Sequence, residues 1–328
     1  MNIKATDQER LLVKAARLYY EGELTQAEIS QRLRLSRQKV QRLLQAARRE
    51  GVVQISIRPV MGIFDEEERR LEQVYGLREA IVVETSDYGD HDTVTREVGV
   101  AAAEYLLRAL QPNDTITISW GSSLLGMVNT LYASANKIEV EGIKVVQGLG
   151  GLGDPTTEVH AGDLTRRLAS ILNGQAVLLP APGSTGSLAA GEAFLTDPHV
   201  QQALEAARSA NLAFMGIGAP RRDSILIRRG TIVDWEELSA LKSKGAVGDI
   251  NLRYFDIDGM QIASALNDRV IGLTLEEIRQ IETVVGVAGG EAKYNAIYGA
   301  VRGQLIDVLV TDDATARRLI KDSGDQKE

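Results

Sequence analysis

Two short helices joined by a tight turn are predicted by Leu24-Thr-Gln-Ala-Glu-Ile-Ser-Gln-Arg-Leu-Arg-Leu-Ser-Arg-Gln-Lys-Val-Gln-Arg-Leu-Leu44. Apolar residues recur on both sides of the turn at the spacing of helices that bury one face. They are Leu24, Ala27 and Leu33 before the turn and Val40, Leu43 and Leu44 after it. Ser36 is the expected N-cap of the second helix, because its hydroxyl can accept a backbone N–H of the following turn. We therefore expect both helices to share one small core.

A third helix and a β-wing are expected to complete this domain, which spans residues 1–58. An earlier amphipathic run supplies the third helix that so small a core needs. Its apolar residues are Leu11, Leu12, Ala15, Leu18 and Tyr19. Residues 51–58 alternate between apolar and polar side chains, as a strand does. The pattern predicts a helix-turn-helix domain that resembles a winged helix.

The second helix of the pair has the side chains that a DNA-reading helix needs. Between Arg32 and Arg49 the chain has seven basic residues and no acidic one. Arg, Lys and Gln can bond base edges or phosphates in a major groove. We therefore predict DNA binding; the alternative is an ordinary three-helix domain whose surface charges are only solvated. The residues expected to contact DNA are Thr25, Gln26, Ser36, Arg37, Gln38, Lys39, Gln41 and Arg42.

Charge separates this domain from the rest of the chain. Residues 1–58 hold 12 Lys or Arg and 6 Asp or Glu, a net charge of +6. The whole chain carries −8, so residues 59–328 carry −14. Because phosphate attracts only the cationic part, the acidic part is expected to have a different task.

Composition excludes several kinds of protein. The chain has no cysteine, which removes disulfides, thiolate catalysis and Cys-based metal sites. Its three histidines, His91, His160 and His199, show no metal-ligand spacing. No apolar run approaches the roughly 20 residues of a membrane span, and the polar start lacks a secretory segment. We expect a cytoplasmic protein with no metal, no cofactor and no membrane contact.

An α/β domain with a mostly parallel sheet is predicted for residues 76–328, because strand-like apolar runs alternate there with helical patterns. Strands are expected at 80–83, 115–119, 143–147, 176–179, 212–216, 284–288 and 308–311, and helices at 92–110, 123–135, 158–173, 197–209, 274–281 and 291–303. Residues 59–75 are expected to form a linker and a charged helix over 65–75. Such sheets bind ligands beyond the carboxyl ends of their strands, so the strand-to-helix loops are the candidate site.

Two of these loops suit a small anion. Gly121 ends a strand and lets the backbone approach a ligand, while Ser122 and Ser123 stand at a helix N-terminus that favours a phosphate oxygen. The alternative is a plain tight turn with an N-cap. Lys293 lies in the first turn of another helix, where the dipole disfavours a cation, so it needs an anionic ligand or Glu291. Asp256 is expected either to accept sugar hydroxyls or to cap a turn.

These segments together resemble the SorC family of bacterial sugar-responsive transcriptional regulators, which is sometimes grouped with DeoR-type regulators. The likeness spans nearly the whole chain. Its elements are Thr25-Gln-Ala-Glu-Ile29, Leu35-Ser-Arg37, Trp120-Gly-Ser-Ser123, Leu179-Pro-Ala-Pro182, Gly245-Ala-Val-Gly-Asp249, Gly289-Gly-Glu-Ala-Lys293 and Asp307-Val-Leu-Val-Thr-Asp-Asp-Ala-Thr-Ala316. The resemblance implies a DNA-binding domain and an effector domain similar to glucosamine-6-phosphate deaminases and ribose-5-phosphate isomerases.

The resemblance also implies a phosphorylated sugar as effector and a homo-oligomer, a dimer or tetramer, which the helix over 65–75 could help to assemble. A dimer would suit a palindromic operator. Gly121, Ser122 and Ser123 match the family's phosphate-binding loop, with Ser123 where threonine is commoner, and Lys293 matches an effector-contacting lysine. The full effector-binding set is expected to be Trp120, Gly121, Ser122, Ser123, Gln147, Asp256 and Lys293.

The hypothesis is therefore a DNA-binding transcriptional regulator, not an enzyme, controlled by a sugar or sugar phosphate. One alternative is a sugar-phosphate isomerase or deaminase with a fused DNA-binding domain. The acidic and histidine side chains it would use, Asp154, Glu158, His160 and Asp163, show no recognisable catalytic arrangement. Another is a redox sensor that binds a nicotinamide dinucleotide at Gly148-Leu-Gly-Gly-Leu-Gly153, but there Asp154-Pro155 delays the helix that the fingerprint should open.

Overall fold

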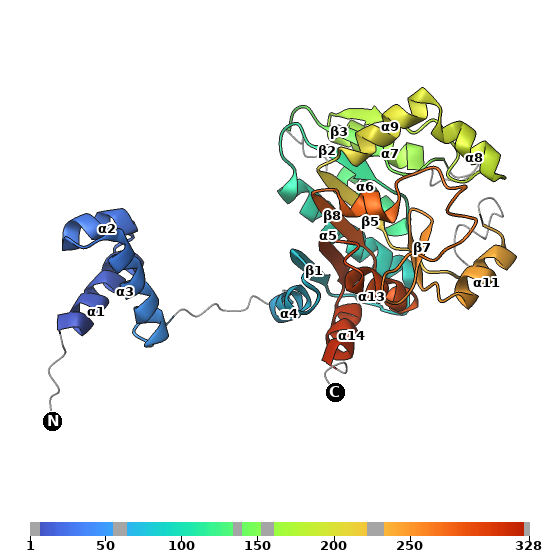
Figure 1. Cartoon of the computed structure of the whole chain (residues 1–328). Coiled ribbons are helices and arrows are strands. Elements are labelled where there is room, and N and C mark those ends of the chain that lie inside the picture. Colours follow the sequence, from blue (N-terminus) through green and yellow to red (C-terminus); the bar gives the residue numbers. More distant parts are fainter. Residues whose placement is uncertain (1–6, 55–63, 134–139, 152–160, 222–232, 325–328) are drawn as a thin grey trace. The chain divides into compact units, whose positions relative to one another are not determined.

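The chain forms two compact units, Met1–Val60 and Met61–Glu328, which we call the head and the body. The computed structural model describes residues 7–54, 64–133, 140–151, 161–221 and 233–324 (Figure 1). Each unit has hydrophobic clusters made only of its own residues. No helix in the described part of the chain is both long and apolar enough to cross a membrane.

The head consists of three helices around one core: α1 (Asp7–Tyr20), α2 (Gln26–Leu33) and α3 (Arg37–Arg49). Helix α2 begins with a reciprocal capping box between Thr25 and Glu28. As predicted, the Ser36 hydroxyl caps α3 by accepting the Lys39 N–H at 3.2 Å. Between the two helices, Arg34 adopts the left-handed conformation at φ 52°, which turns the chain.

One predicted core residue of the head is wrong. Ala27 is exposed, and Ile29 is the fully buried residue of α2. Leu24 and Leu33 pack at the edge of the core, as expected. Because α2 has only 8 residues, a small rotation about its axis decides which side chain reaches the core, and apolar spacing over so short a helix does not define that rotation.

The predicted wing is not seen in the residues that the structure describes. Gly51–Gln54 contain no strand, and residues 55–58 lie outside the described residues. Val53 instead closes the end of α3: its N–H bonds the Ala47 carbonyl at 3.0 Å, and its side chain packs against the core.

The body contains the predicted parallel sheet, in the order β1-β9-β8-β5-β2-β3-β4. All six neighbouring pairs are parallel. The strands are β1 (Glu79–Val83), β2 (Thr115–Ile118), β3 (Lys144–Gln147), β4 (Gln175–Val177), β5 (Leu212–Gly216), β8 (Thr283–Val287) and β9 (Val308–Asp312). All seven predicted strands are confirmed.

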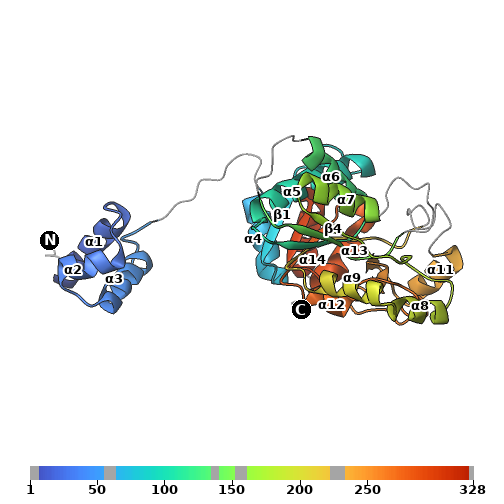
Figure 2. The ribbon, with the colours of Figure 1, turned by 90° about the horizontal axis from the view of Figure 1, so that it is seen from above.

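Helices cover both faces of the sheet, which Figure 2 shows from above. One face packs against α5 (His91–Ala109), α6 (Ser122–Ala133) and α7 (Ala161–Ile171). The other packs against α4 (Asp65–Tyr75), α9 (Pro198–Arg208), α12 (Leu275–Arg279), α13 (Tyr294–Arg302) and α14 (Asp313–Gly324). Strand β5 shows the alternation: Leu212 and Phe214 face the first group, whereas Ala213 and Met215 face the second.

A small lobe that the sequence pattern did not predict stands beside the sheet. It contains the antiparallel pair β6 (Gly248–Ile250) and β7 (Arg253–Phe255) and the helices α8 (Leu188–Leu195) and α11 (Trp235–Ser243). Its strands have only three residues each, too few to show alternation. Asn251 and Leu252 make the turn with positive φ values of 53° and 60°.

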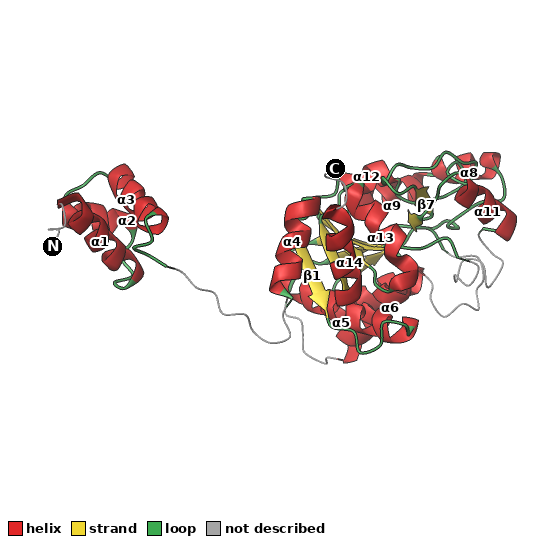
Figure 3. Ribbon diagram, turned by 90° about the horizontal axis from the view of Figure 1, so that it is seen from below, coloured by secondary structure: helices red, strands yellow, loops and turns green. Residues whose placement is uncertain are grey.

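Helix α4 belongs to the body and shields the edge of its sheet (Figure 3). Its Leu71 is fully buried. Glu68 accepts the Val82 N–H at 2.9 Å, and Glu72 accepts the Ala80 N–H at 3.1 Å. These N–H groups point away from β9, so the two glutamates satisfy donors that an edge strand leaves unpaired. Burial raises the pKa of Glu68.

Candidate functional site

Four central strands of the body, β8, β5, β2 and β3, end side by side at one edge of the sheet. The loops after them contain most of the predicted effector residues. The ends of β5 and β2 approach so closely that a side chain on Gly216 would lie 2.7 Å from the Trp120 carbonyl oxygen. This edge is therefore where the loops converge.

The loop after β2 leaves the start of α6 open. Gly121 holds a φ of 146°, which favours glycine, and has no side chain to cap the helix. The first helical bond that involves this residue runs from the Leu125 N–H to the Gly121 carbonyl at 2.9 Å. Among the described residues, no acceptor pairs with the N–H groups of Ser122, Ser123 and Leu124. Free N–H groups at a helix start suit an anion.

The two serines of this loop differ in exposure. Ser122 is exposed, whereas Ser123 is only 3% exposed. Only Ser122 therefore presents its hydroxyl openly. Neither hydroxyl bonds another described residue.

Lys293 is influenced electrostatically by a buried carboxylate, Asp249, that sequence reasoning missed. It ends the short helix η1 (Glu291–Lys293), directly before α13, and is partly buried. Burial lowers the pKa of Lys293 to about 8, while the negative charge of Asp249 opposes this shift. Its electrostatic partner is thus Asp249 rather than Glu291, which is exposed.

Asp249 is 6% exposed. An isolated antiparallel β-bridge to Gly218 places it just beyond the end of β5. A side chain on Gly218 would overlap its Oδ1 atom, so the glycine makes room for the carboxylate. Burial raises the pKa of Asp249 to about 6, against a hydrogen bond from the Leu252 N–H and the charge of Lys293. The sequence did contain a signal for Asp249: the segment 245–249 is one of the elements of the family resemblance, but no role was assigned to it.

A second buried carboxylate holds the glycine loop before Lys293. Asp312, at the end of β9, accepts the Gly290 N–H at 2.7 Å, the Thr315 N–H at 2.8 Å and the Thr315 hydroxyl at 2.7 Å. It is fully buried. These bonds tie the η1 loop to the start of α14 and so position Lys293.

Three predicted effector residues pack against or bond other residues of the protein itself. Trp120 is buried in the core under α5, α6 and α7. Gln147 donates to the Leu149 carbonyl at 2.7 Å and accepts the Leu179 N–H at 3.3 Å. Asp256 caps its own turn by accepting the N–H groups of Asp258 and Met260 at 3.0 and 2.9 Å. These bonds position the side chains of Gln147 and Asp256 within the fold, and ligand contact by the three residues stays a prediction.

The glycine loop after β3 is held by the small lobe. Asn251 donates to the Gly148 carbonyl at 3.1 Å, and the Gly150 N–H bonds the Ile271 carbonyl at 2.9 Å. The buried Arg253 donates to the carbonyls of Asn267 and Val270 and so fixes the segment around Ile271. These bonds fix residues 148–151 beside the small lobe.

The side chains that an enzymatic alternative would use are not assembled in the described structure. Asp154, Glu158 and His160 lie outside the described residues. Asp163, on α7, approaches Arg167 at 4.0 Å. In the part of the chain that the structure describes, no cluster of His, Asp or Glu could hold a metal ion.

The head displays its basic residues on the outer side of α3. Val40, Leu43, Leu44 and Ala47 are buried, whereas the predicted DNA contacts on α3, Arg37, Gln38, Lys39, Gln41 and Arg42, are all exposed. Among the described residues, Arg37, Lys39 and Arg42 have no ion-pair partner, whereas Arg49 pairs with Glu50 at 3.5 Å. Cations near a helix N-terminus oppose the dipole, so this arrangement suits an external anion.

The remaining predicted DNA contacts lie at the N-termini of α2 and α3. Thr25 and Ser36 use their hydroxyls to cap α2 and α3, and both are exposed. Gln26 is half-buried at the start of α2. All three therefore contribute to the surface around the N-termini of α2 and α3.

Known proteins resemble the chain over almost its full length. Residues 60–321 match the family described as "Putative sugar-binding domain". The chain is 33% identical to the deoxyribonucleoside regulator of Bacillus subtilis (strain 168), covering 96% of this chain and 99% of that protein. It is 34% identical to the transcriptional regulator LsrR of Escherichia coli (strain K12), covering 96% and 95%. The crystal structure of the full-length sorbitol operon regulator SorC from Klebsiella pneumoniae superposes with a TM-score of 0.71 at 28% identity, covering 96% of this chain and all of that one.

Proposed function

Because the chain belongs to the SorC family of sugar-binding transcriptional regulators, we propose that its head reads an operator and its body binds a phosphorylated sugar that controls this reading. One observation supports the proposal above all: exposed basic residues without ion-pair partners among the described residues lie on the head, and a helix start with open N–H groups lies on the body. We further propose a cytoplasmic homo-oligomer, a palindromic operator and no enzymatic activity.

For the head, we propose that α3 enters the major groove. Arg37, Gln38, Gln41 and Arg42 lie on its exposed side, and such side chains can bond base edges, while Lys39 suits a phosphate. The buried side of α3 is held by α1 and α2, so the helix can be presented as a rigid unit. Thr25 and Gln26, at the N-terminus of α2, are proposed to contact the DNA beside the groove that α3 enters.

For the body, we propose that the phosphate of the effector binds at the start of α6. The N–H groups of Ser122, Ser123 and Leu124 and the exposed Ser122 hydroxyl are donors for its oxygens. Lys293 adds a positive charge, and Asp249 can accept a sugar hydroxyl when it is ionised. Asp249 therefore takes the role that the sequence pattern suggested for Asp256.

The body offers a route from this site to the helix nearest the head in sequence. Tyr294, next to Lys293, stacks on Tyr298 with ring centroids 6.0 Å apart, and Tyr298 meets Tyr75 of α4 edge-on at 6.3 Å. Tyr75 donates to the Leu319 carbonyl of α14 at 2.7 Å. We propose that a shift of η1 on effector binding moves this row of tyrosines and, through it, α4.

Titration of phosphorylated sugars into the full-length protein, with and without operator DNA, tests the function. An effector changes DNA affinity only if it prefers one conformation, and linkage then requires DNA to change effector affinity by the same factor. We expect one sugar phosphate to bind with different affinities in the two series. Identical affinities would contradict coupling, and turnover of the sugar phosphate would contradict the absence of catalysis.

A further inference from the structure

The carboxylate of Asp312 divides its two oxygens between two tasks. Its Oδ1 atom accepts the Thr315 N–H at 2.8 Å, as an N-cap does in the first turn of a helix, here α14. Its Oδ2 atom accepts the Gly290 N–H at 2.7 Å and the Thr315 hydroxyl at 2.7 Å. One oxygen therefore closes a helix, and the other holds the loop that leads into η1.

The bonds to Oδ2 lie in a fully buried contact, since neither Asp312 nor Thr315 is exposed. On the loop, Gly289 leaves the space for it: a side chain there would lie 2.6 Å from Oδ2 and 2.9 Å from the Val94 side chain of α5. Hydrogen bonds to a carboxylate in such surroundings are strong, because no water competes for them. The glycine loop is therefore seated against the end of β9, the start of α14 and α5.

The placement of Gly290 is passed on to Lys293 by one tight turn of backbone. The Lys293 N–H bonds the Gly290 carbonyl at 3.0 Å, and this bond closes η1. We propose that Asp312 and Thr315 are positioning residues of the effector site: the Thr315 hydroxyl keeps Oδ2 turned toward the loop, Oδ2 holds Gly290, and η1 then presents Lys293. Neither residue needs to touch the effector.

This inference deepens the proposed function and rests on it only for the contact between Lys293 and an effector, because the placement of Lys293 can be measured without one. Burial lowers the pKa of Lys293 to about 8, while the charge of Asp249 opposes this shift. When Oδ2 releases Gly290, η1 is free to move its lysine toward water, and weaker desolvation raises the pKa again. The pKa of Lys293 therefore reports where η1 holds it.

Three substitutions break the contact from different sides. Asp312→Asn replaces one acceptor oxygen by an amide donor, and Thr315→Val removes the hydroxyl while keeping the shape of the side chain. Gly289→Ala pushes the loop off Oδ2 and leaves α14 unchanged. Thr315→Ser keeps the hydroxyl and should preserve the contact. The matched control is Thr311→Val, because Thr311 is also fully buried and its hydroxyl has no hydrogen-bond partner among the described residues.

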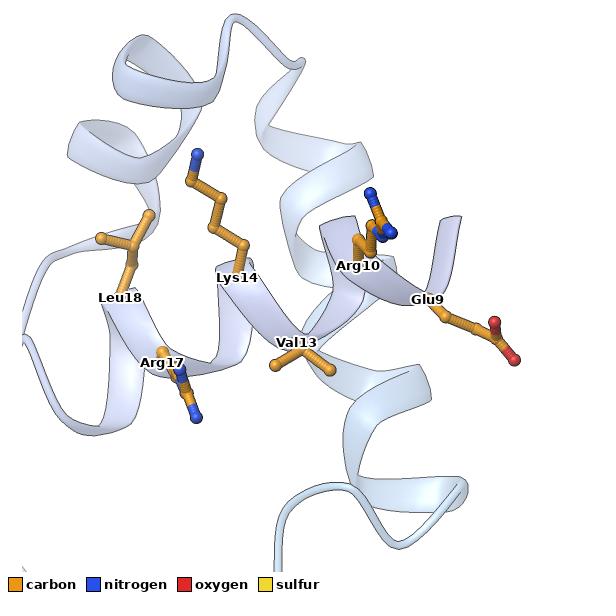
Figure 4. A pocket seen from close by; sticks show the side chains of 6 residues that line it. All are labelled: Glu9, Arg10, Val13, Lys14, Arg17 and Leu18. Carbon is orange, nitrogen blue, oxygen red and sulfur yellow. The ribbon is translucent and has the colours of Figure 1, made fainter. Parts of the chain in front are cut away.

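Competitive labelling of lysines over a pH series, read by mass spectrometry, measures the pKa of Lys293 in the full-length protein. The internal reference is Lys14, an exposed lysine of the head that lines an open hollow on α1 (Figure 4). We expect the pKa of Lys293 to rise in the three variants and to keep its wild-type value in Thr315→Ser and Thr311→Val, while Lys14 reacts alike in all. An unchanged pKa in folded Thr315→Val and Gly289→Ala, or an equal rise in Thr311→Val, would overturn the proposal.

Binding of inorganic phosphate to the same proteins at neutral pH separates this inference from the proposed function. We expect Thr315→Val to bind phosphate about two- to tenfold more weakly, as for the loss of one hydrogen bond, and Thr315→Ser and Thr311→Val to bind it normally. Normal binding in Thr315→Val despite a raised pKa of Lys293 would overturn the role of this contact in the effector site. A wild-type protein that binds no phosphate, with the pKa of Lys293 moving as expected, would contradict the proposed effector and leave the positioning of Lys293 intact.

Discussion

Helix α3 of the head and helix α6 of the body start in opposite ways. The hydroxyl of Ser36 caps α3, whereas the position before α6 is Gly121, which has no side chain, and the first N–H groups of α6 have no acceptor among the described residues. A helix that reads DNA with side chains can have its own N-terminus closed. A loop that binds a small anion with backbone groups has to leave them open. The difference supports separate tasks for the two units.

The two units also hold their positive charges differently. Arg37, Lys39 and Arg42 are exposed, so salt screens their attraction to phosphates. Lys293 is partly buried and is influenced by the charge of Asp249, so pH affects it more than salt does. We therefore expect DNA binding to weaken steeply with ionic strength and effector binding to depend mainly on protonation.

The largest effect is expected for Lys293→Ala. The variant removes the cation of the proposed site, and loss of a hydrogen bond from a charged group costs about 1.5–3 kcal/mol of effector binding. Calorimetric titration with a phosphorylated sugar measures the loss. Lys242→Ala, at an exposed lysine of α11, is the matched control and should bind normally. DNA affinity without effector should stay unchanged in both variants.

Arg37→Ala and Arg42→Ala should weaken operator binding by about 1–3 kcal/mol each if the lost contact is to a base edge. If the contact is to a phosphate, the slope of log affinity against log salt concentration should decrease in magnitude by about 1. Fluorescence anisotropy at several salt concentrations distinguishes the two cases. Arg49→Ala, whose arginine already pairs with Glu50, is the control. Loss of sugar binding in the folded variants would argue against separate sites.

The pH dependence of effector binding tests the Asp249–Lys293 pair. Burial lowers the pKa of Lys293 to about 8, so the ammonium loses its proton above that pH. Affinity for an anionic sugar should then fall about tenfold per pH unit. Because the charge of Asp249 raises the pKa of Lys293, Asp249→Asn should move this fall to lower pH. An unchanged alkaline fall in Asp249→Asn would show that the two groups do not interact.

Tyr298→Leu should weaken communication between the units while leaving both binding sites intact. The substitution removes the ring between Tyr294 and Tyr75, and changes along such a chain of contacts alter coupling by about 0.5–2 kcal/mol. The measurement is the ratio of effector affinities with and without operator. Tyr132→Leu, at a ring that is 74% exposed on α6, is the control. A ratio unchanged in Tyr298→Leu would exclude the tyrosine route.

The smallest expected effect is on helix stability, and it compares the start of α3 with the start of α6. Ser36→Ala should destabilise α3 by about 1 kcal/mol, because the Lys39 N–H loses its acceptor. Ser122→Ala should leave the stability of α6 unchanged, because no hydrogen bond to a described residue is lost. Hydrogen exchange of the two helices reports both. Equal loss of protection in the two variants would remove the contrast between a closed and an open start.

Local features of the fold were predictable from the sequence. The α2–turn–α3 unit, the Ser36 cap and all seven strands of the main sheet follow from apolar periodicity and from residues within a few positions of one another. The strand-to-helix loops were likewise predictable as the candidate site, because parallel strands bring their carboxyl ends to one edge. Gly121, Ser122 and Lys293 lie there in the structure.

Only the tertiary structure decides which residues far apart along the chain interact with one another. The charge of Asp249 acts on Lys293 because the β6–β7 lobe packs beside the end of β5, and no local pattern in the sequence relates the two residues. The backbone partners of Gln147 and Asp256 are likewise supplied only by the folded chain. A side chain's spacing determines whether it can lie on a helix or strand, but the desolvation and hydrogen bonds that set its chemistry depend on which distant segments surround it.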